Sequence, residues 1–285
     1  MNWIVTSALM VIGSVLLYLT VRKSSILKFP TQFNNLAMFL IPLISYLLIG
    51  LSTGISYSIP VNYLAIFALV AFFLMYLPNV TSLKSIELAP NPGYSLVISK
   101  SYVVFTTLIS YLFLNGEIST QKVFAILLII IFSGLITIDP KKTKQSSSKF
   151  WVPYTLYSFF GWGLLSLSIK YFALQGMSTL TTLTYLYSFV STFIVLEIIF
   201  RKIQYEVNYV TLRYFLLIGI FSSIFNYYNF YSVSIAPNVG YVNAINAASI
   251  SIVTIFSIVL FKDDFSRRKM LGVFGVTGGL LLLLI

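Results

Sequence analysis

Long uncharged stretches, separated by short charged or turn-forming segments, dominate the chain. Residues 1–21, 29–83 and 214–261 contain no Asp, Glu, Lys or Arg. A helix that crosses a bilayer needs about 20 apolar residues, so each of the two longer stretches can hold two helices. The polar segment 52–62 divides the first of these, and the Pro-Asn-Val-Gly turn at 237–240 divides the second.

The same pattern, followed along the whole sequence, predicts ten transmembrane helices. They are expected at 1–21, twice within 29–83, and at 93–114, 121–138, 150–172, 180–200, 214–236, 241–261 and 270–285. Pro42 and Pro78 fall inside apolar stretches. Proline lacks the backbone N–H and clashes with the preceding turn, so both helices are expected to kink.

Composition narrows the class to a polytopic α-helical membrane protein. Charged residues make up 9% of the 285, hydrophobic residues make up 58%, and the mean hydropathy is +0.94. Soluble domains carry about 25% charged residues, so they are excluded. Helices satisfy their own backbone groups in lipid, which favours an all-α fold.

The absence of His and Cys excludes several kinds of chemistry. No disulfide, thiolate nucleophile, imidazole base or zinc cluster can form. We therefore expect no enzyme activity, no metal and no cofactor. The net charge of +11 lies in segments between apolar spans, so it points to orientation in a lipid bilayer and not to a nucleic-acid partner.

An internal repeat divides the chain into two halves. Residues 89–94 (Ala-Pro-Asn-Pro-Gly-Tyr) recur at 236–241 (Ala-Pro-Asn-Val-Gly-Tyr), and the offset of 147 holds without gaps over 44 positions, twelve of them identical. We predict a five-helix repeat at 1–140, a linker at 141–149 and a second repeat at 150–285. Because five is odd, the second repeat should cross the membrane inverted, with a substrate site in a central cavity near the midplane.

These motifs resemble a known family. The helix ending at Ala89-Pro90, the long apolar helix that follows, and the segment Leu-Asn-Gly-Glu-Ile-Ser at 114–119 look like the EamA-like branch of the drug/metabolite transporter superfamily. Gly161-Trp162-Gly163 is similar to the tryptophan-glycine step that opens a repeat there. The first helix lacks this step, and the arginine usual early in helix two is absent. The resemblance implies a ten-helix bundle with a central cavity, alternating access and small-metabolite substrates.

Lys100 is the most informative charged residue in the spans. It lies about seven residues into its helix, roughly 10 Å from the helix start. A lysine at this depth costs about 2–3 kcal/mol unless it reaches an interface or a partner. It either contacts an anion or carboxylate in the cavity or extends its ammonium toward the nearer interface.

Four asparagines are expected inside the bundle. Asn79 and Asn226 are equivalent in the repeat, and Asn243 and Asn246 share one face of their helix. Amides at this depth need partners, either neighbouring helices or a hydrated cavity. The predicted substrate-binding residues are Lys100, Asn79, Asn226, Tyr227, Asn243, Asn246 and Trp162.

The acidic residues give one candidate for coupling. Lys84 and Glu87 are three residues apart near a helix end, where they can form an ion pair, and Glu87 is the carboxylate best placed to carry a proton. Glu197, beside Arg201, is interpreted as an interface residue. Gly272, Gly275, Gly278 and Gly279 are expected to allow close helix packing.

The sequence therefore predicts a secondary transporter in the cell membrane that moves a small anionic or zwitterionic metabolite, an amino acid or organic acid, by alternating access. No nucleotide-binding loop is present. The alternatives are an exporter of aromatic or cationic organic compounds, which tyrosine and tryptophan faces can bind, and an uncoupled channel. Basic loop residues favour termini outside the cell, whereas the family resemblance implies termini inside.

Overall fold

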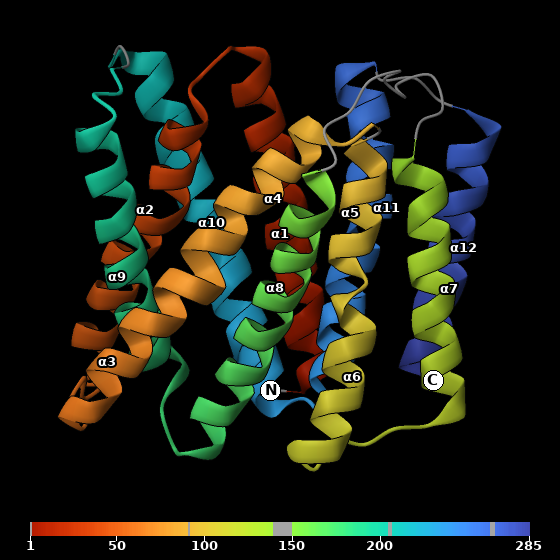
Figure 1. Cartoon of the computed structure of the whole chain (residues 1–285), viewed down its shortest axis with the longest axis horizontal. Helices are drawn as coiled ribbons and strands as arrows, with labels where there is room; N and C mark the ends of the chain where they lie inside the picture. Colours follow the sequence, from red (N-terminus) through yellow and green to blue (C-terminus); the bar gives the residue numbers. More distant parts are fainter. Residues whose placement is uncertain (1, 91, 139–149, 205–206, 263–265) are drawn as a thin grey trace. The chain divides into compact units, whose positions relative to one another are not determined.

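The computed structural model describes residues 2–90, 92–138, 150–204, 207–262 and 266–285, and all regular structure within them is helical (Figure 1). The elements are α1 (Trp3–Ile26), α2 (Thr31–Ser52), α3 (Val61–Val70), η1 (Ala71–Tyr76), α4 (Leu77–Leu88), α5 (Pro92–Lys100), α6 (Tyr102–Phe113), α7 (Thr120–Thr137), α8 (Trp151–Leu174), α9 (Thr179–Phe200), α10 (Tyr209–Ile235), α11 (Val239–Phe261) and α12 (Arg267–Leu284).

The described part of the chain forms ten helical spans, the number that the sequence predicts. Helices α3, η1 and α4 form one continuous helix, and α5 and α6 form another. Eight of the spans in the described part of the chain are long and apolar enough to cross a membrane. The other two are α8, which contains Lys170 and several hydroxyl side chains, and α12, which begins with three basic residues. The chain is a multi-pass α-helical membrane protein, and the predicted linker at 141–149 lies outside the described residues.

The two helix-internal prolines have different surroundings. Pro42 lies within α2, which stays α-helical throughout. Pro78 follows the π-helical segment η1 by two residues. A proline removes one backbone donor and crowds the carbonyl four residues earlier, and that carbonyl belongs to η1. The wider π turn is a recognised way to absorb such a disruption.

The helices group into two compact units that do not coincide with the predicted repeats. Unit 1 comprises residues 1–76 and 172–234, and unit 2 comprises residues 77–171 and 235–285. Each unit contains helices from both halves of the sequence. The division into repeats at 1–140 and 150–285 stays a prediction about sequence symmetry.

Equivalent helices of the two halves pack antiparallel within unit 2. Ser110 Oγ accepts a bond from Val239 N at 3.3 Å, and Thr106 Oγ1 accepts one from Asn243 Nδ2 at 3.1 Å, so α6 and α11 run in opposite directions. Helices α7 and α12 also run in opposite directions, because Gly272 near the start of α12 lies against Ile136 near the end of α7, whereas Gly279 lies against residues 125–129. This direction supports an inverted relation between the halves.

In unit 1, α2 and α9 are also antiparallel. Tyr187 contacts the rings of Phe39 and Tyr46 at 5.2 and 5.5 Å, and Tyr185 Oη donates to Tyr57 O at 2.8 Å. From Phe39 forward to Tyr57, the partner on α9 moves back from Tyr187 to Tyr185, so the two segments run in opposite directions. Helix α10 lies against α1, where a Cβ on Gly13 would come within 2.7 Å of Phe225 N.

Repeated serines cap repeated helices. Ser119 and Ser266 are the N-caps of α7 and α12, and their hydroxyls accept from Lys122 N and Lys269 N, each at 3.3 Å. A serine in this position satisfies a backbone donor that the first turn leaves unpaired. The serine and the lysine are the same in both copies of the repeat, and in both copies they form the same helix cap.

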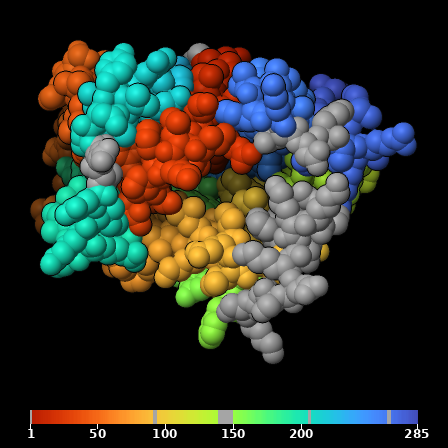
Figure 2. All heavy atoms as spheres, turned by 90° about the horizontal axis from the view of Figure 1, so that it is seen from above, coloured from red at the N-terminus to blue at the C-terminus, as the bar shows by residue number. Residues whose placement is uncertain are grey.

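Basic side chains gather at one end of each unit. In unit 1 the exposed residues Arg22, Lys23, Lys28, Arg201, Lys202 and Arg213 all lie near the α1–α2 and α9–α10 connections in the sequence. Figure 2 shows the red and teal segments of this unit from above. In unit 2, Lys262 and the basic start of α12 share one end, and Lys122 and Lys170 lie toward the other. The chain termini lie at the end away from the basic cluster of their own unit.

We predict that Gly272→Ala destabilises the protein and that Gly278→Ala does not. A Cβ on Gly272 would lie 2.9 Å from the Phe132 carbonyl oxygen, whereas nothing lies within 4 Å at Gly278, contrary to the sequence expectation for that glycine. Overpacking against backbone costs about 1–3 kcal/mol. The melting temperatures of the two variants in detergent make the comparison, and equal values would refute the tight α7–α12 contact.

We predict that a cytoplasm-only fluorescent reporter fused after Ile285 stays dark. The ends that carry the basic residues should face the cytoplasm, which leaves both termini on the outer side. A reporter in the α9–α10 connection should fluoresce as the positive control. Bright fluorescence from the C-terminal fusion would instead give the orientation that the family resemblance implies.

Candidate functional site in the transmembrane units

The second copy of the repeated motif joins the two halves of the sequence within unit 2. Asn238 caps α11 by accepting from Gly240 N at 2.8 Å, and its Nδ2 donates to Glu117 O at 2.8 Å. Tyr241 Oη donates to the same carbonyl at 2.8 Å, and Glu117 N donates to Pro237 O at 3.0 Å. This arrangement gives the motif a structural role at the start of α11.

Asn243 bridges three helices. Its Nδ2 donates to Thr106 Oγ1 at 3.1 Å, and its Oδ1 accepts from Ser166 Oγ at 3.4 Å. The side chain is buried and joins α11 to α6 and α8. Of the two readings that the sequence allows for an intramembrane asparagine, this geometry fits the interhelical partner.

Asn246, one turn further along α11, is different. The residue is buried, and among the described residues its Oδ1 has no hydrogen-bond partner. A buried carbonyl oxygen without a partner costs about 1–3 kcal/mol. The Asn246 oxygen is therefore a group that a ligand or an ordered water could satisfy.

Lys100 lies half-buried at the end of α5, in the middle of a span. The helix is interrupted at Ser101 and continues as α6. Because α6 and α11 are antiparallel, with Thr106 opposite Asn243, Lys100 lies at the level of the α11 turn that holds Asn246 and Ser249. A mid-span lysine at the depth of an unsatisfied amide is a favourable arrangement for binding a polar solute.

A third polar group comes from α7. Ser133 is buried, and its hydroxyl has no hydrogen-bond partner in the part of the chain that the structure describes. The next residue, Gly134, approaches the Val97 side chain of α5, with the nearest methyl 3.5 Å from its ideal Cβ. Ser133 thus lies less than one helical turn from the level of Lys100.

Trp162 and Asn79 are half-buried in unit 2. The glycines beside Trp162 bring α8 close to its neighbours, since a Cβ on Gly163 would lie 2.7 Å from the Phe105 ring and one on Gly161 would overlap Pro78. The tryptophan-glycine step therefore has a packing role.

Asn226 and Tyr227 belong to unit 1. Asn226 Nδ2 donates to the carbonyl and hydroxyl oxygens of Ser222 at 2.9 and 3.0 Å. The Tyr227 ring stacks on Tyr231 at 6.1 Å and meets Tyr228 edge-on at 5.4 Å. The predicted substrate-binding residues thus divide between the units, with Lys100, Asn79, Asn243, Asn246 and Trp162 in unit 2.

The residues proposed for coupling lie near the end of α4. Lys84 and Glu87 are both exposed, and the Lys84 ammonium lies 5.8 Å from the centre of the Tyr154 ring. No group of three His, Cys, Asp or Glu side chains in the described ranges could hold a metal ion.

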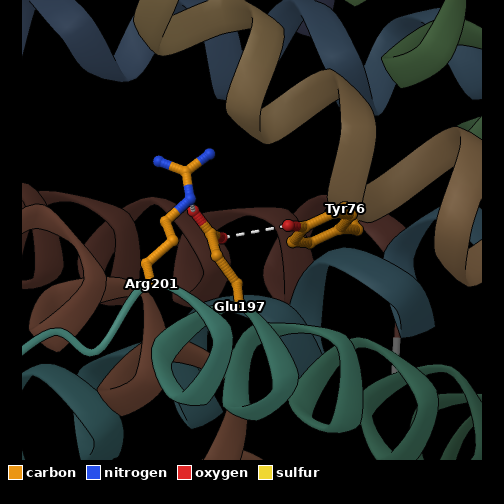
Figure 3. Close-up of polar contacts among 3 residues, drawn as sticks. All are labelled: Tyr76, Glu197 and Arg201. Atoms are coloured by element: carbon orange, nitrogen blue, oxygen red, sulfur yellow. Dashed lines mark hydrogen bonds and ion pairs between the residues drawn. The ribbon is translucent and has the colours of Figure 1, made fainter.

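Two further charged contacts were not foreseen from the sequence. Lys170 Nζ donates to Ala236 O at 2.8 Å, a contact between α8 and the segment before α11. Glu197 accepts from Tyr76 Oη at 3.0 Å and pairs with Arg201 Nε at 3.2 Å (Figure 3). Only the spacing of Glu197 and Arg201, four residues apart in a helix, was visible in the sequence.

Comparison with known protein families gives a match over the second half of the chain. Residues 149–285 match the EamA-like transporter family. This agrees with the drug/metabolite transporter superfamily expected from the sequence motifs. The match covers the second half of the chain, and the members of that family are transporters.

The fold is also similar to that of a solved structure. A crystal structure described only as that of a protein superposes with a TM-score of 0.79 at 13% identity, over 98% of this chain and 96% of the other. Among curated proteins, no sequence matches significantly. At this level of identity the structural match shows the fold alone.

We predict that Asn238→Ala lowers the stability of the protein by about 1–3 kcal/mol, because it removes a helix cap and the Nδ2 bonds to Thr107 O and Glu117 O. The Asn62→Ala variant, at an exposed position in α3, is the matched control. Thermal unfolding in detergent compares them. An unchanged melting temperature for Asn238→Ala would show that these bonds contribute nothing.

Proposed function

We propose that the chain is a secondary transporter that moves a small anionic or zwitterionic metabolite, an amino acid or organic acid, across the cell membrane by alternating access. The observation that carries this proposal is the set of polar groups in unit 2. Lys100 supplies a positive charge in mid-span, and Asn246 Oδ1 and Ser133 Oγ are buried with unused hydrogen-bonding capacity.

The charge of Lys100 favours an anionic group on the substrate. Placing a lysine at this depth in a span costs about 2–3 kcal/mol, and a carboxylate or other anion on the substrate would offset part of that cost. Asn246 Oδ1 accepts hydrogen bonds, so it suits an ammonium or hydroxyl group on the same solute. An amino acid or a hydroxylated organic acid combines both features.

The sequence symmetry favours a carrier over a channel. Inverted halves give a transporter two related conformations of similar free energy, open to opposite sides. The antiparallel pairs α2–α9, α6–α11 and α7–α12 support this inversion of 1–140 relative to 150–285. In this proposal Asn79, Asn226, Asn243, Tyr227 and Trp162 shape the substrate site, and Glu87 with Lys84 is a candidate for coupling near the interface.

One observation favours the second candidate function. Tyr227, Tyr228 and Tyr231 form an aromatic cluster on α10. The faces of such rings bind organic cations, with energies of about 0.5–2 kcal/mol each. An exporter of aromatic or cationic compounds would use this cluster in place of Lys100.

Flux into proteoliposomes separates these functions. Radiolabelled amino acids, organic acids, nucleosides and quaternary amines are offered singly to vesicles that contain the purified protein, with empty vesicles as the control. The proposal requires uptake of a carboxylate-bearing solute. Uptake confined to quaternary amines would establish the cation exporter instead.

We predict that Lys100→Gln, or Lys100→Ala, lowers the flux of that solute at least tenfold. Loss of a hydrogen bond to a charged group costs about 1.5–3 kcal/mol, and 1.4 kcal/mol corresponds to a factor of ten. Lys23→Ala removes an exposed lysine near the end of α1 and should leave flux unchanged. Normal flux in well-expressed Lys100 variants would show that this lysine only extends toward an interface.

A further inference from the structure

The basic residues of unit 1 are confined to one end of its helices. The α1–α2 and α9–α10 connections lie at the same end of the unit (Figure 1). The lysines and arginines of this unit all lie in or near these two connections: Arg22, Lys23, Lys28, Arg201, Lys202 and Arg213. The sequence of the unit holds two acidic residues, Glu197 and Glu206, and Glu197 pairs with Arg201 at 3.2 Å. This end therefore carries an excess of positive charge.

The packing of α1 against α10 brings the end of one helix beside the start of the other. Ser232 Oγ donates to Thr6 Oγ1 at 2.7 Å near the start of α1. Further along α1, Gly13 lies against Phe225, so the partner on α10 moves back as α1 moves forward. The last turn of α1 and the connection that follows it therefore lie next to the first turns of α10.

An aromatic cluster fixes this neighbourhood. Its members contact one another with ring centres 5.1 to 6.0 Å apart and are Phe29, Phe33, Tyr214 and Phe215. Within the cluster, the Phe29 ring meets the Tyr214 ring edge-on at 6.0 Å. Lys28 directly precedes Phe29, and Arg213 directly precedes Tyr214. The cluster therefore holds Lys28 and Arg213 on neighbouring segments, although they are far apart in the sequence.

Lys28 and Lys202 occupy backbone positions at which glycine is usual. Each follows the C-cap of its helix and has a positive φ, 61° for Lys28 and 50° for Lys202. In both helices, the N–H of the next residue donates to the carbonyl five residues earlier, which completes a Schellman end. A Cβ in this left-handed conformation crowds the following carbonyl oxygen. Lysine at both positions is unfavourable for the backbone, which points to a use for its charge.

We propose that this end of unit 1 binds the headgroup of an anionic phospholipid, with Lys28 and Arg213 as the groups that contact its phosphate. Both side chains are exposed. A guanidinium donates two parallel hydrogen bonds to a phosphate, and the ammonium of lysine adds a second positive charge. Aromatic rings at the ends of membrane spans lie at headgroup depth. Basic residues clustered beside such spans attract anionic lipids.

Exposed apolar side chains among the basic residues favour a lipid over a dissolved phosphate. Leu27 precedes Lys28, Leu212 precedes Arg213, and both leucines are exposed. Further exposed apolar residues near the same connections are Ile26, Phe200 and Val210. The acyl chains of a lipid would remove such side chains from water, whereas a dissolved phosphate would leave them there. This inference goes beyond the proposed transport function and does not depend on it.

Lipid titration of the purified protein in a neutral detergent tests the site. Native mass spectrometry measures bound lipid, and the melting temperature measures its effect on stability. Phosphatidylglycerol should bind about tenfold more tightly than phosphatidylcholine, whose headgroup has no net charge, and should raise the melting temperature. Glycerol 3-phosphate offers a phosphate without acyl chains and should have no effect. Equal responses to the two lipids, or the same response to glycerol 3-phosphate, would overturn the proposal.

The double variant Lys28→Gly/Arg213→Gln separates the charge from the fold. Glycine suits the left-handed backbone at position 28, so without lipid the variant should melt no lower than the unmodified protein. Its affinity for phosphatidylglycerol should fall about tenfold, because two phosphate contacts are lost. Lys28→Arg/Arg213→Lys keeps both charges and should bind phosphatidylglycerol as the unmodified protein does.

Lys84→Gln/Lys122→Gln is the matched control, because it removes the same positive charge from unit 2. This variant should bind phosphatidylglycerol as tightly as the unmodified protein. An equal loss of affinity in the control would show that net charge alone governs lipid binding. Unchanged affinity in Lys28→Gly/Arg213→Gln would show that the lipid binds elsewhere. Either result would overturn the proposal.

Discussion

A polar group inside the bilayer must find its partner within the protein, and this constraint organises the whole structure. The backbone meets it by forming helices. Threonine and serine side chains meet it largely within their own helix, as Thr107 Oγ1 does by donating to Val103 O at 2.8 Å. The Asn226 amide also does so within its own helix, whereas Asn238 and Asn243 each join segments that are far apart in sequence.

Because of this constraint, buried polar groups that lack a described partner are candidates for binding a solute. Asn246 Oδ1 and Ser133 Oγ are buried in unit 2 without a described partner, and Lys100 brings a charge to the same depth. In unit 1, Glu197 is shielded but held by two donors. The first set suits a solute that brings its own polar groups, whereas the Glu197 carboxylate already has its partners within the protein.

The spans could be predicted from the sequence because charges interrupt them, but their ends could not be placed exactly from this signal. Helix α1 extends to Ile26 and includes Arg22 and Lys23, since long basic side chains reach water from a helix end. The break at Ser101 and the π turn at Ala71–Tyr76 left no mark in the hydrophobic pattern. Pro78 indicated a disruption but not its type.

Hydrophobic periodicity could not predict which residues far apart in the sequence contact each other. The bond between Tyr76 and Glu197 joins positions 121 apart, and that between Lys170 and Ala236 joins positions 66 apart. Asn243 and Asn246 looked alike in the sequence, because both lie on one helix face. Only the positions of Thr106 and Ser166 distinguish the amide that is satisfied from the one that is not.

Counterflow in proteoliposomes tests the central claim, that this chain is a carrier, most directly. Vesicles are preloaded with unlabelled substrate and diluted into a trace of the same labelled solute. A carrier that alternates between two faces should accumulate label transiently above its external concentration. Label that only rises to equilibrium, at a rate independent of the preloaded solute, would contradict alternating access and show a channel.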